Sequence, residues 1–473
     1  MTLYSLNIRN RQFEEAKAHL IRPDGQERAG YLLCRPSRSG ADPWERQAHE
    51  HFLVTAFRPV PDEDVLESIE SRVTWLTRSF VKILKEAEQT GQAVAVIHNH
   101  PAGHQRFSPQ DDANEPDLLQ GALNRNGPGT RILSVILTPD EALIGRIWLH
   151  PSPTGKEPLS SIKVVGPRLA LHYPGRSGSA EPRAFHRQAL AFGPALNHDL
   201  RHLRVGIVGC GGTGSAVAML LARLGVGQLA LFDNDIIDQT NLNRLHGAHQ
   251  SDADAMLPKV DVVAREITSM GLGVRVARFD AWVGDPSCRD ALKACDVLFG
   301  CTDDHDGRMF LNRYAYYYLT PVIDIGLAID VGEGKPPEII ALDARVTVLG
   351  AGSTCMICRG IVDPRIASDQ ALKRQEAAEY EKRKAEAYVF GEGNPSPAVV
   401  TFTTELACMG VNELIHRMQG FRGPGGHADN RVRKFHLSED RRPGRPPNDW
   451  CVICGNSELW GLGDADPFLG RVD

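Results

Sequence analysis

Residues 203–225, LRVGIVGCGGTGSAVAMLLARLG, decide the fold of the larger part of this chain. The first seven residues are rich in apolar and β-branched side chains and predict a buried strand, whereas TGSAVAMLLARLG predicts a helix. Working outward from this stretch, we expect further strands at 228–233, 296–301, 321–326 and 344–350, and a helix at 308–318. Strands that alternate with helices are typical of an α/β protein with a doubly wound parallel sheet.

The glycines between the first strand and the helix are typical of a loop that holds phosphate. Glycine lets the backbone approach a phosphate closely, and the free N–H groups at a helix N-terminus carry partial positive charge. Asp233 ends the next strand, 19 residues after Gly214, where a carboxylate can hold ribose hydroxyls. A domain that binds NAD or FAD would share these features, so the loop alone does not distinguish a redox domain from an ATP-binding one.

The polar residues that follow favour ATP over a redox cofactor. The stretch DNDIIDQTNLNR supplies Asp235, Asn241 and Arg244, and Lys259 comes shortly after it. A dehydrogenase does not need such a cluster, whereas an enzyme that splits the α–β phosphate bond of ATP does, because charge builds on the departing pyrophosphate. Asp303, in the C-T-D-D that ends another strand, is placed to hold magnesium at the carboxyl edge of the sheet.

These features together resemble the ThiF/MoeB and ubiquitin-activating enzyme family, whose members have a Rossmann-like domain and adenylate the C-terminal glycine of ubiquitin-like proteins. The resemblance covers roughly residues 184–455. It implies a nucleotide site made of Gly209, Gly211, Gly212 and Gly214 in the loop, Asp233 at the ribose with Asp235 nearby, Asn241, Arg244 and Lys259 at the phosphates, and Asp303 at magnesium. In A-F-H-R-Q, Arg187 matches the arginine that reaches into the active site of the other subunit of a family dimer.

Four of the ten cysteines form two C-x-x-C pairs, Cys355/Cys358 and Cys451/Cys454, with 92 residues between the pairs. Two such pairs fit a closed, tetrahedral structural zinc site, and a single pair would also fit a redox site. The ThiF/MoeB resemblance supports structural zinc, since the family has the same two pairs in the same order.

The charged and Gly/Pro-rich excursion at about 359–398 occupies the position of this family's crossover loop, under which the substrate tail threads. Family members that form a thioester or persulfide often have a cysteine there, but this segment has none, and the next cysteine is Cys408. We therefore expect the acyl-adenylate to pass to an external nucleophile, either a sulfur donor or the thiol of a conjugating enzyme.

A second motif, HNHPAGHQRFSPQD, lies in the first 150 residues. His98 and His100 are two apart on or next to a predicted strand at 93–98, so their side chains can converge on one ion. Two neutral imidazoles and one carboxylate are a common ligand set for catalytic zinc, which leaves a fourth position for water. Hydrolysis also needs a general base and a donor to the oxyanion.

This motif resembles the JAMM (JAB/MPN) metalloproteases, which cleave peptide or isopeptide bonds after ubiquitin-like tails. The resemblance implies His98, His100 and Asp111 as zinc ligands, Ser108 on the oxyanion side, and Glu27, in E-R-A-G-Y-L-L, as the general acid/base. Three neighbouring acidic residues are alternatives to these assignments: Asp112 to Asp111, and Glu45 and Glu50 to Glu27.

Length and composition bound these hypotheses. At 473 residues the chain is long enough for two or three domains, and we expect a JAMM-like α/β domain at 1–150, a linker at 151–183 and a ThiF/MoeB-like domain at 184–473. The net charge is −6, and no apolar run is long enough to span a membrane, so we expect a cytoplasmic protein that binds neither nucleic acid nor lipid.

The sequence therefore predicts a bifunctional enzyme that uses ATP, magnesium and two zinc ions. One domain would trim or release a ubiquitin-like or sulfur-carrier protein ending in glycine, and the other would adenylate that glycine, as a homodimer. One alternative is an adenylating enzyme for a small peptide or sulfur carrier, in which the JAMM-like domain is a non-catalytic docking module.

Overall fold

The computed structural model describes residues 2–174, 182–385 and 397–470, and the chain forms two units. The first unit comprises Met1–Ala41, Gln47–Gly178 and Trp460–Pro467. The second comprises Asp42–Arg46, Ser179–Leu459 and Phe468–Asp473. Two short segments thus depart from the order of the sequence. Residues 42–46 belong to the second unit, although they lie within the N-terminal part of the chain, and residues 460–467 belong to the first unit, although they lie near the C-terminus.

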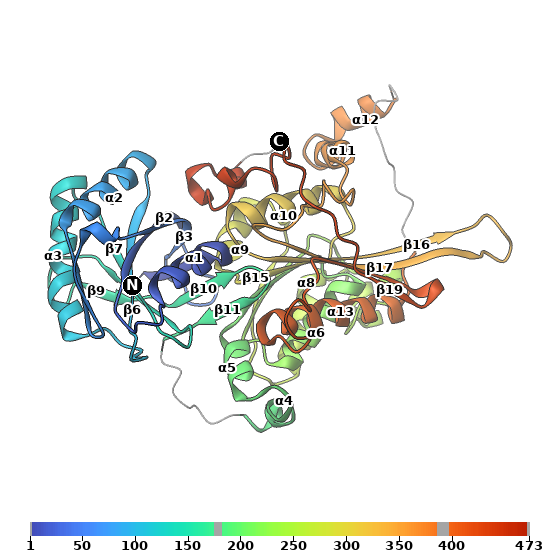
Figure 1. The fold of residues 1–473 in the computed structure, drawn as a ribbon. Coiled ribbons are helices and arrows are strands. Elements are labelled where there is room, and N and C mark those ends of the chain that lie inside the picture. Colours follow the sequence, from blue (N-terminus) through green and yellow to red (C-terminus); the bar gives the residue numbers. More distant parts are fainter. Residues whose placement is uncertain (1, 175–181, 386–396, 471–473) are drawn as a thin grey trace. The chain divides into compact units, whose positions relative to one another are not determined.

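The first unit is built on a nine-stranded mixed sheet with the order β11-β10-β1-β3-β2-β6-β7-β8-β9 (Figure 1). Its strands are β1 (Leu3–Arg9), β2 (Ala29–Ser39), β3 (His49–Pro59), β6 (Ala93–Asn99), β7 (Ile132–Leu137), β8 (Leu143–Trp148), β9 (Lys156–Pro158), β10 (Ser161–Val165) and β11 (Leu169–His172). A separate two-stranded sheet pairs β4 (Val65–Ile69) with β5 (Arg72–Trp75).

Much of the expected linker at 151–183 is part of this sheet. Residues 156–172 form β9, β10 and β11, and β10 pairs in parallel with β1. Every residue of β10 is buried, so the Pro- and Gly-rich composition around it misled the prediction. Residues 175–181, in the same predicted linker, lie outside the described residues.

Helices cover both faces of the first sheet. Along β2, Leu32 and Cys34 face the core that includes α1 (Asn10–Leu20), whereas Tyr31 and Leu33 face the core formed with α2 (Thr77–Thr90) and α3 (Pro109–Asn126). This alternation follows from the two-residue period of a strand, and it places α3 on a defined face of the sheet that carries β6.

The second unit contains an eight-stranded sheet with the order β14-β13-β12-β15-β16-β17-β18-β19. Its strands are β12 (Arg204–Val208), β13 (Gln228–Phe232), β14 (Arg275–Phe279), β15 (Val297–Gly300), β16 (Val322–Val331), β17 (Ile339–Leu349), β18 (Asn430–Lys434) and β19 (Glu439–Arg441). The first five in this order are parallel, which confirms the doubly wound part of the prediction. The predicted strand at 344–350 is instead antiparallel, because β17 returns along β16 as a long hairpin (Figure 1).

Helices pack on both faces of the second sheet. The described helices of this unit are α4 (His186–Phe192), α5 (Pro194–His202), α6 (Gly212–Leu224), α7 (Gln250–Asp254), α8 (Lys259–Ser269), α9 (Arg289–Ala294), α10 (His305–Tyr317), α11 (Pro364–Gln375), α12 (Ala377–Ala385) and α13 (Val400–Gln419), and only some of them contact the sheet. Gly410 of α13 lies over Phe299 and Ile323, whereas Leu311 of α10 lies against the next residue of β15, Gly300, on the other face. The predicted helix at 308–318 corresponds to α10.

Part of the predicted crossover excursion is helical. Helices α11 and α12 begin at Pro364 and Ala377, and residues 386–396 lie outside the described residues. Among the helices that the structure describes, none has the length and apolar character needed to cross a membrane.

Candidate functional site

A polar pocket of about 380 Å³ opens where β12, β13 and β15 end, beside the middle of β16. This is the carboxyl edge of the parallel strands, where doubly wound proteins bind their ligands. Nine of the predicted nucleotide-site residues line it: Gly209, Gly211, Gly212, Asp233, Asp235, Asn241, Arg244, Lys259 and Asp303. Sequence analysis missed other members of the lining, above all Trp282 and Arg308.

Two predicted residues do not line the pocket. Gly214 lies inside the first turn of α6, where an added Cβ would be 1.8 Å from the carbonyl oxygen of Gly209. It therefore lets the helix approach the loop, while Gly209, with φ +89°, makes the turn itself. Arg187 is exposed on α4 and is not part of this pocket within the described chain.

Asp233 and Lys259 form the charged centre of the pocket. The Asp233 carboxylate accepts hydrogen bonds from the backbone N–H groups of Cys210 (2.5 Å) and Asp235 (2.8 Å). Burial raises the pKa of Asp233, and the charge of Lys259 opposes this only in part. Burial would lower the pKa of Lys259, but Asp233, an ion pair with Asp235 at 2.7 Å and the charge of Asp303 raise it overall. Lys259 is therefore a fixed cation.

Arg244 and Asn241 approach the glycine loop from the segment after β13. An added Cβ at Gly212 would be 3.2 Å from Cγ of Arg244, so the arginine stem packs directly on the loop. The Arg244 guanidinium donates to the carbonyl oxygen of Thr240. Asn241 is buried and accepts from the N–H of Asp238 at 3.3 Å.

The two acidic residues after β15 have different roles in the structure. Asp304 caps α10, since its carboxylate accepts from the N–H of Gly307. Asp303 is exposed in the pocket and forms no hydrogen bond or ion pair with another described residue, so its oxygens are available to a cation. Arg308, one turn into α10, pairs with the fully buried Asp324 at 3.4 Å. No motif marks this arginine, because its partner lies on another strand.

The first unit brings His98, His100 and Asp111 together. The two histidine Nε2 atoms are 3.1 Å apart, and they lie 3.4 and 3.7 Å from oxygens of Asp111. Neighbouring ligands in a tetrahedral zinc site with bonds near 2.0 Å are about 3.3 Å apart, so this donor set fits zinc. His100 Nδ1 hydrogen bonds at 2.9 Å to the carbonyl oxygen of His104, which turns Nε2 of His100 toward Asp111.

Ser108 and Asp111 are held by the start of α3. Ser108 is the N-cap residue, and its Oγ accepts from the N–H of Asp111 at 3.2 Å, while Asp111 accepts from the N–H of Ser108 at 2.7 Å. Asp112 instead forms ion pairs with Arg146 and Lys156. The alternative ligand is thus turned away from the histidines.

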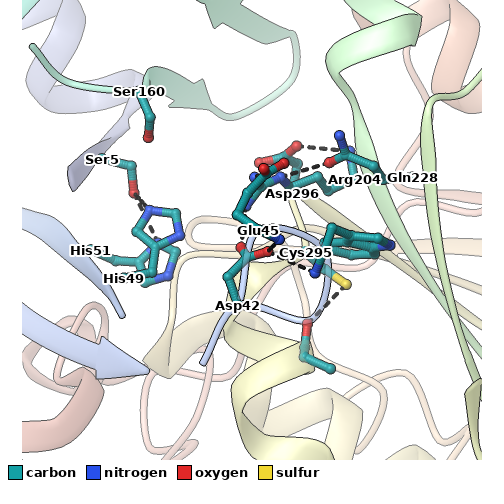
Figure 2. Close-up of polar contacts among 12 residues, drawn as sticks. Ser5, Asp42, Glu45, His49, His51, Ser160, Arg204, Gln228, Cys295 and Asp296 are labelled. Atoms are coloured by element: carbon teal, nitrogen blue, oxygen red, sulfur yellow. Dashed lines mark hydrogen bonds and ion pairs between the residues drawn. The ribbon is translucent and has the colours of Figure 1, made fainter. Parts of the chain in front are cut away.

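Of the three candidate general acids/bases Glu27, Glu45 and Glu50, Glu27 is the one that lies near the histidines. It precedes β2 and is 8% exposed, and burial raises its pKa although the charges of His98 and His100 oppose the shift. The alternative Glu50 is buried against Arg131 at 2.7 Å. Glu45 belongs to the second unit, where it pairs with Arg275 at 2.5 Å and lies 3.8 Å from Arg204 (Figure 2).

A second H-x-H sequence in the first unit shows that the spacing alone is not enough. His49 and His51 stack with ring centroids 3.8 Å apart, and both contact the Ser5 hydroxyl (Figure 2). Among the described residues, they do not form a cluster of three candidate metal ligands.

The four predicted zinc cysteines converge in the second unit. Sγ of Cys355 is 3.7 Å from Sγ of Cys451, and Sγ of Cys358 is 3.6 Å from Sγ of Cys454. Bonds of 2.3 Å to a tetrahedral zinc would place neighbouring sulfurs about 3.8 Å apart. All four side chains are buried, so this donor set fits a closed metal site.

Three basic residues of β18 form ion pairs with nearby acids. Arg431 pairs with Asp440, Arg433 with Glu405, and Lys434 with Asp343. This stretch is therefore not a free positive surface.

The fold defines a Rossmann-type α/β protein with an additional N-terminal unit. The sequence profile of the ThiF family matches residues 185–451, more than half of the chain, so the chain belongs to the ThiF family. The profile of prokaryotic homologues of the JAB domain matches residues 10–148, and the chain therefore combines a JAB-like and a ThiF-type domain.

Three curated relatives resemble part of the chain. Over 234 residues the chain is 26% identical to the molybdopterin-synthase adenylyltransferase of Escherichia coli, covering 48% of this chain and 86% of the relative. It is 26% identical to the Bacillus subtilis sulfur carrier protein ThiS adenylyltransferase, covering 37% and 53%. It is 34% identical to ubiquitin-like modifier-activating enzyme 5 of Drosophila persimilis, covering 24% and 32%. The chain thus spans about half the length of the second relative and about a third of the length of the third.

Among solved structures, E. coli MccB with succinimide matches 59% of this chain and 75% of that chain, with 19% identity and a TM-score of 0.45.

Proposed function

We propose that the second unit is an ATP-dependent adenylyltransferase that activates the C-terminal glycine of a ubiquitin-like or sulfur-carrier protein. The observation that carries this proposal is the single pocket that gathers the glycine loop, Asp233, Lys259 and Asp303. Similarity to adenylyltransferases of sulfur carriers and to ubiquitin-like modifier-activating enzymes supports the substrate class.

In the proposed reaction, a carboxylate oxygen of the glycine attacks the α-phosphorus of ATP, the bond from this phosphorus to the bridging oxygen breaks, and pyrophosphate leaves. Asp233 accepts hydrogen bonds from the ribose hydroxyls. Asn241, Arg244 and Lys259 stabilise the charge that develops on the phosphates. Asp303 would hold magnesium, which prefers carboxylate oxygens.

We further propose a homodimer in which Arg187 completes the site of the other subunit. Its exposure on α4, away from the pocket of its own chain, supports this role. Because the excursion at 359–398 has no cysteine, the acyl-adenylate passes to an external sulfur donor or conjugating-enzyme thiol. The need for ATP and for reduced thiols favours a cytoplasmic location.

ATP–pyrophosphate exchange tests this function. Exchange should require a partner that ends in glycine, and Asp303→Ala should lower it by about 100-fold or more, since the metal-binding carboxylate is lost. Asp304→Asn is a matched control that changes the neighbouring acid. Exchange driven by a short peptide and not by a folded partner would favour the small-peptide alternative, and NAD binding without ATP binding would remove the proposal.

For the first unit, we propose zinc-dependent cleavage after the same glycine. His98, His100 and Asp111 would hold the ion, which supplies Lewis acidity toward water and a carbonyl oxygen. Glu27, a buried carboxyl with a raised pKa, accepts a proton from the attacking water and gives it to the leaving amine. The Ser108 hydroxyl accepts from the N–H of Asp111, so its own proton is free to donate to the oxyanion.

A fusion of the partner to a reporter protein tests this cleavage. We expect two zinc ions per chain and cutting at the glycine. One zinc per chain, lost with Cys355→Ser, and no cutting would favour a non-catalytic docking module.

A further inference from the structure

Asn99 lies between the two histidines of the motif, and its side chain hydrogen bonds to the backbone of residues 26 and 28. It is 1% exposed, and its Nδ2 donates to the carbonyl oxygen of Gln26 at 3.1 Å. Its Oδ1 accepts from the N–H of Arg28 at 2.6 Å, and its own N–H donates to the carbonyl oxygen of Arg28 at 3.2 Å. Gln26 and Arg28 are the two neighbours of Glu27.

These bonds continue the β2–β6 pairing beyond its last strand residue. The antiparallel register places Ala29 opposite His98, so Arg28 comes opposite Asn99. The side chain of Asn99 accepts the Arg28 N–H there and also reaches Gln26. Gln26 and Arg28, which precede β2, are thereby hydrogen bonded directly to the strand that carries His98.

The backbone of Glu27 itself hydrogen bonds to two residues of β4. Its N–H donates to the carbonyl oxygen of Ile69 at 2.8 Å, and its carbonyl oxygen accepts from the Ser68 hydroxyl at 2.8 Å. Glu27 therefore sits between the end of β4 and Asn99. The Asn99 side chain connects the neighbours of Glu27 to the sheet that carries the histidines, whereas β4 is not part of that sheet.

We propose that Asn99 is a positioning residue that fixes Glu27 relative to His98 and His100. This inference rests on the proposed function of the first unit. A catalytic carboxyl must be held within a fraction of an ångström of its working position, and loops hold residues less tightly than strands do. Asparagine suits this position because the Gln26 carbonyl needs a donor and the Arg28 N–H needs an acceptor, and a carboxamide provides both.

The first test measures the hydrogen bonds directly, without cleavage. In Asn99→Ala, backbone amide exchange in a peptide covering 26–30 should accelerate about tenfold, because the Arg28 N–H loses its acceptor. Zinc affinity should stay within about threefold, since no proposed ligand has changed. Asn126→Ala is a matched control, because it removes a carboxamide that donates to the Leu84 carbonyl at the other end of α3.

The second test is a double-substitution cycle on reporter cleavage. Asn99→Ala should lower kcat about 10- to 100-fold, and the same change in a Glu27→Gln background should have less than about twofold further effect. Asn99→Asp keeps the acceptor for Arg28 but loses the donor to Gln26, so it should give an intermediate loss. It also replaces Asn99→Ala if that variant does not fold.

The outcomes separate the two proposals. Full cleavage by Asn99→Ala, or a further tenfold loss in the Glu27→Gln background, would overturn the positioning role while leaving the protease function intact. A wild-type chain that binds zinc at His98 and His100 but never cleaves would overturn both. Unchanged amide exchange in Asn99→Ala would also overturn the positioning role.

Discussion

The two candidate sites are assembled in opposite ways. The proposed metal ligands of the first site come from one stretch, His98 to Asp111, and only Glu27 is brought in by strand pairing. The proposed nucleotide pocket draws on segments that lie between Val208 and Thr403 in the sequence, and no short segment contains most of it. The first site therefore depends on local geometry, whereas the second depends on the packing of the whole sheet.

Removing each of the two proposed zinc ions separately should have the largest effects, and each removal should affect only one unit. His98→Ala should abolish cleavage and remove one zinc ion, while ATP–pyrophosphate exchange remains. Cys355→Ser should remove the other zinc ion and destabilise the second unit by about 4 kcal/mol or more, because the closed Cys site lies within that fold. Zinc analysis and thermal unfolding measure both effects. Loss of both activities in either variant would contradict separate sites.

The same contrast explains what sequence could predict. In the first site, local structure determines where the side chains point. A strand and its end place His98 and His100, and a helix cap places Ser108 and Asp111, so the spacing in the sequence is enough to predict that they lie together. The glycine loop and Asp233 are equally local, because they join consecutive elements of one βαβ unit. The structure brings these residues together in two clusters, and their chemical roles remain predictions.

What escaped prediction depends on distant pairing. Arg308, on α10, lines the pocket and forms an ion pair with Asp324 of β16, a residue that is distant in the sequence. Strands β9 to β11 lie in a stretch rich in Pro and Gly, and only their partners in the sheet reveal them as strands. Asn99 has no motif of its own, since its role comes from the register between β2 and β6.

Two glycines of the proposed nucleotide loop should differ in their effects on stability and on ATP binding. Gly214→Ala should cost the second unit about 1–3 kcal/mol of stability, because the new Cβ would meet the Gly209 carbonyl oxygen. Gly211→Ala should leave stability nearly unchanged, since nothing lies within 4 Å of its added Cβ. Gly211 nevertheless lines the pocket, so ATP affinity should fall in that variant.

Denaturant unfolding and ATP titration separate these two effects. If Gly211→Ala binds ATP as well as the unsubstituted chain, the phosphates do not approach this glycine. Equal stability of both variants would mean that α6 can move away from the loop at little cost, contrary to the packing at Gly214.

The smallest expected effect concerns Asp233, which shares with Glu27 a pKa raised by burial. Because its pKa is raised, Asp233 takes up a proton at a higher pH than an ordinary aspartate, whose pKa is about 3.9. Only the ionised form accepts bonds from both ribose hydroxyls, so ATP affinity should fall as the pH drops from neutral through that raised pKa, by about tenfold at most. Stability should not fall for the same reason, because protonation removes the cost of burying the charge.

Asp233→Asn isolates this effect, since asparagine does not titrate and any pH dependence left in the variant belongs to ATP itself. Isothermal titration at several pH values compares the two chains. If both lose affinity in parallel, Asp233 is not the ribose acceptor. The two units would then differ in one more respect, because the buried carboxyl of the first would have a proton-transfer role and that of the second would serve only to hold the Cys210 and Asp235 amides in the loop.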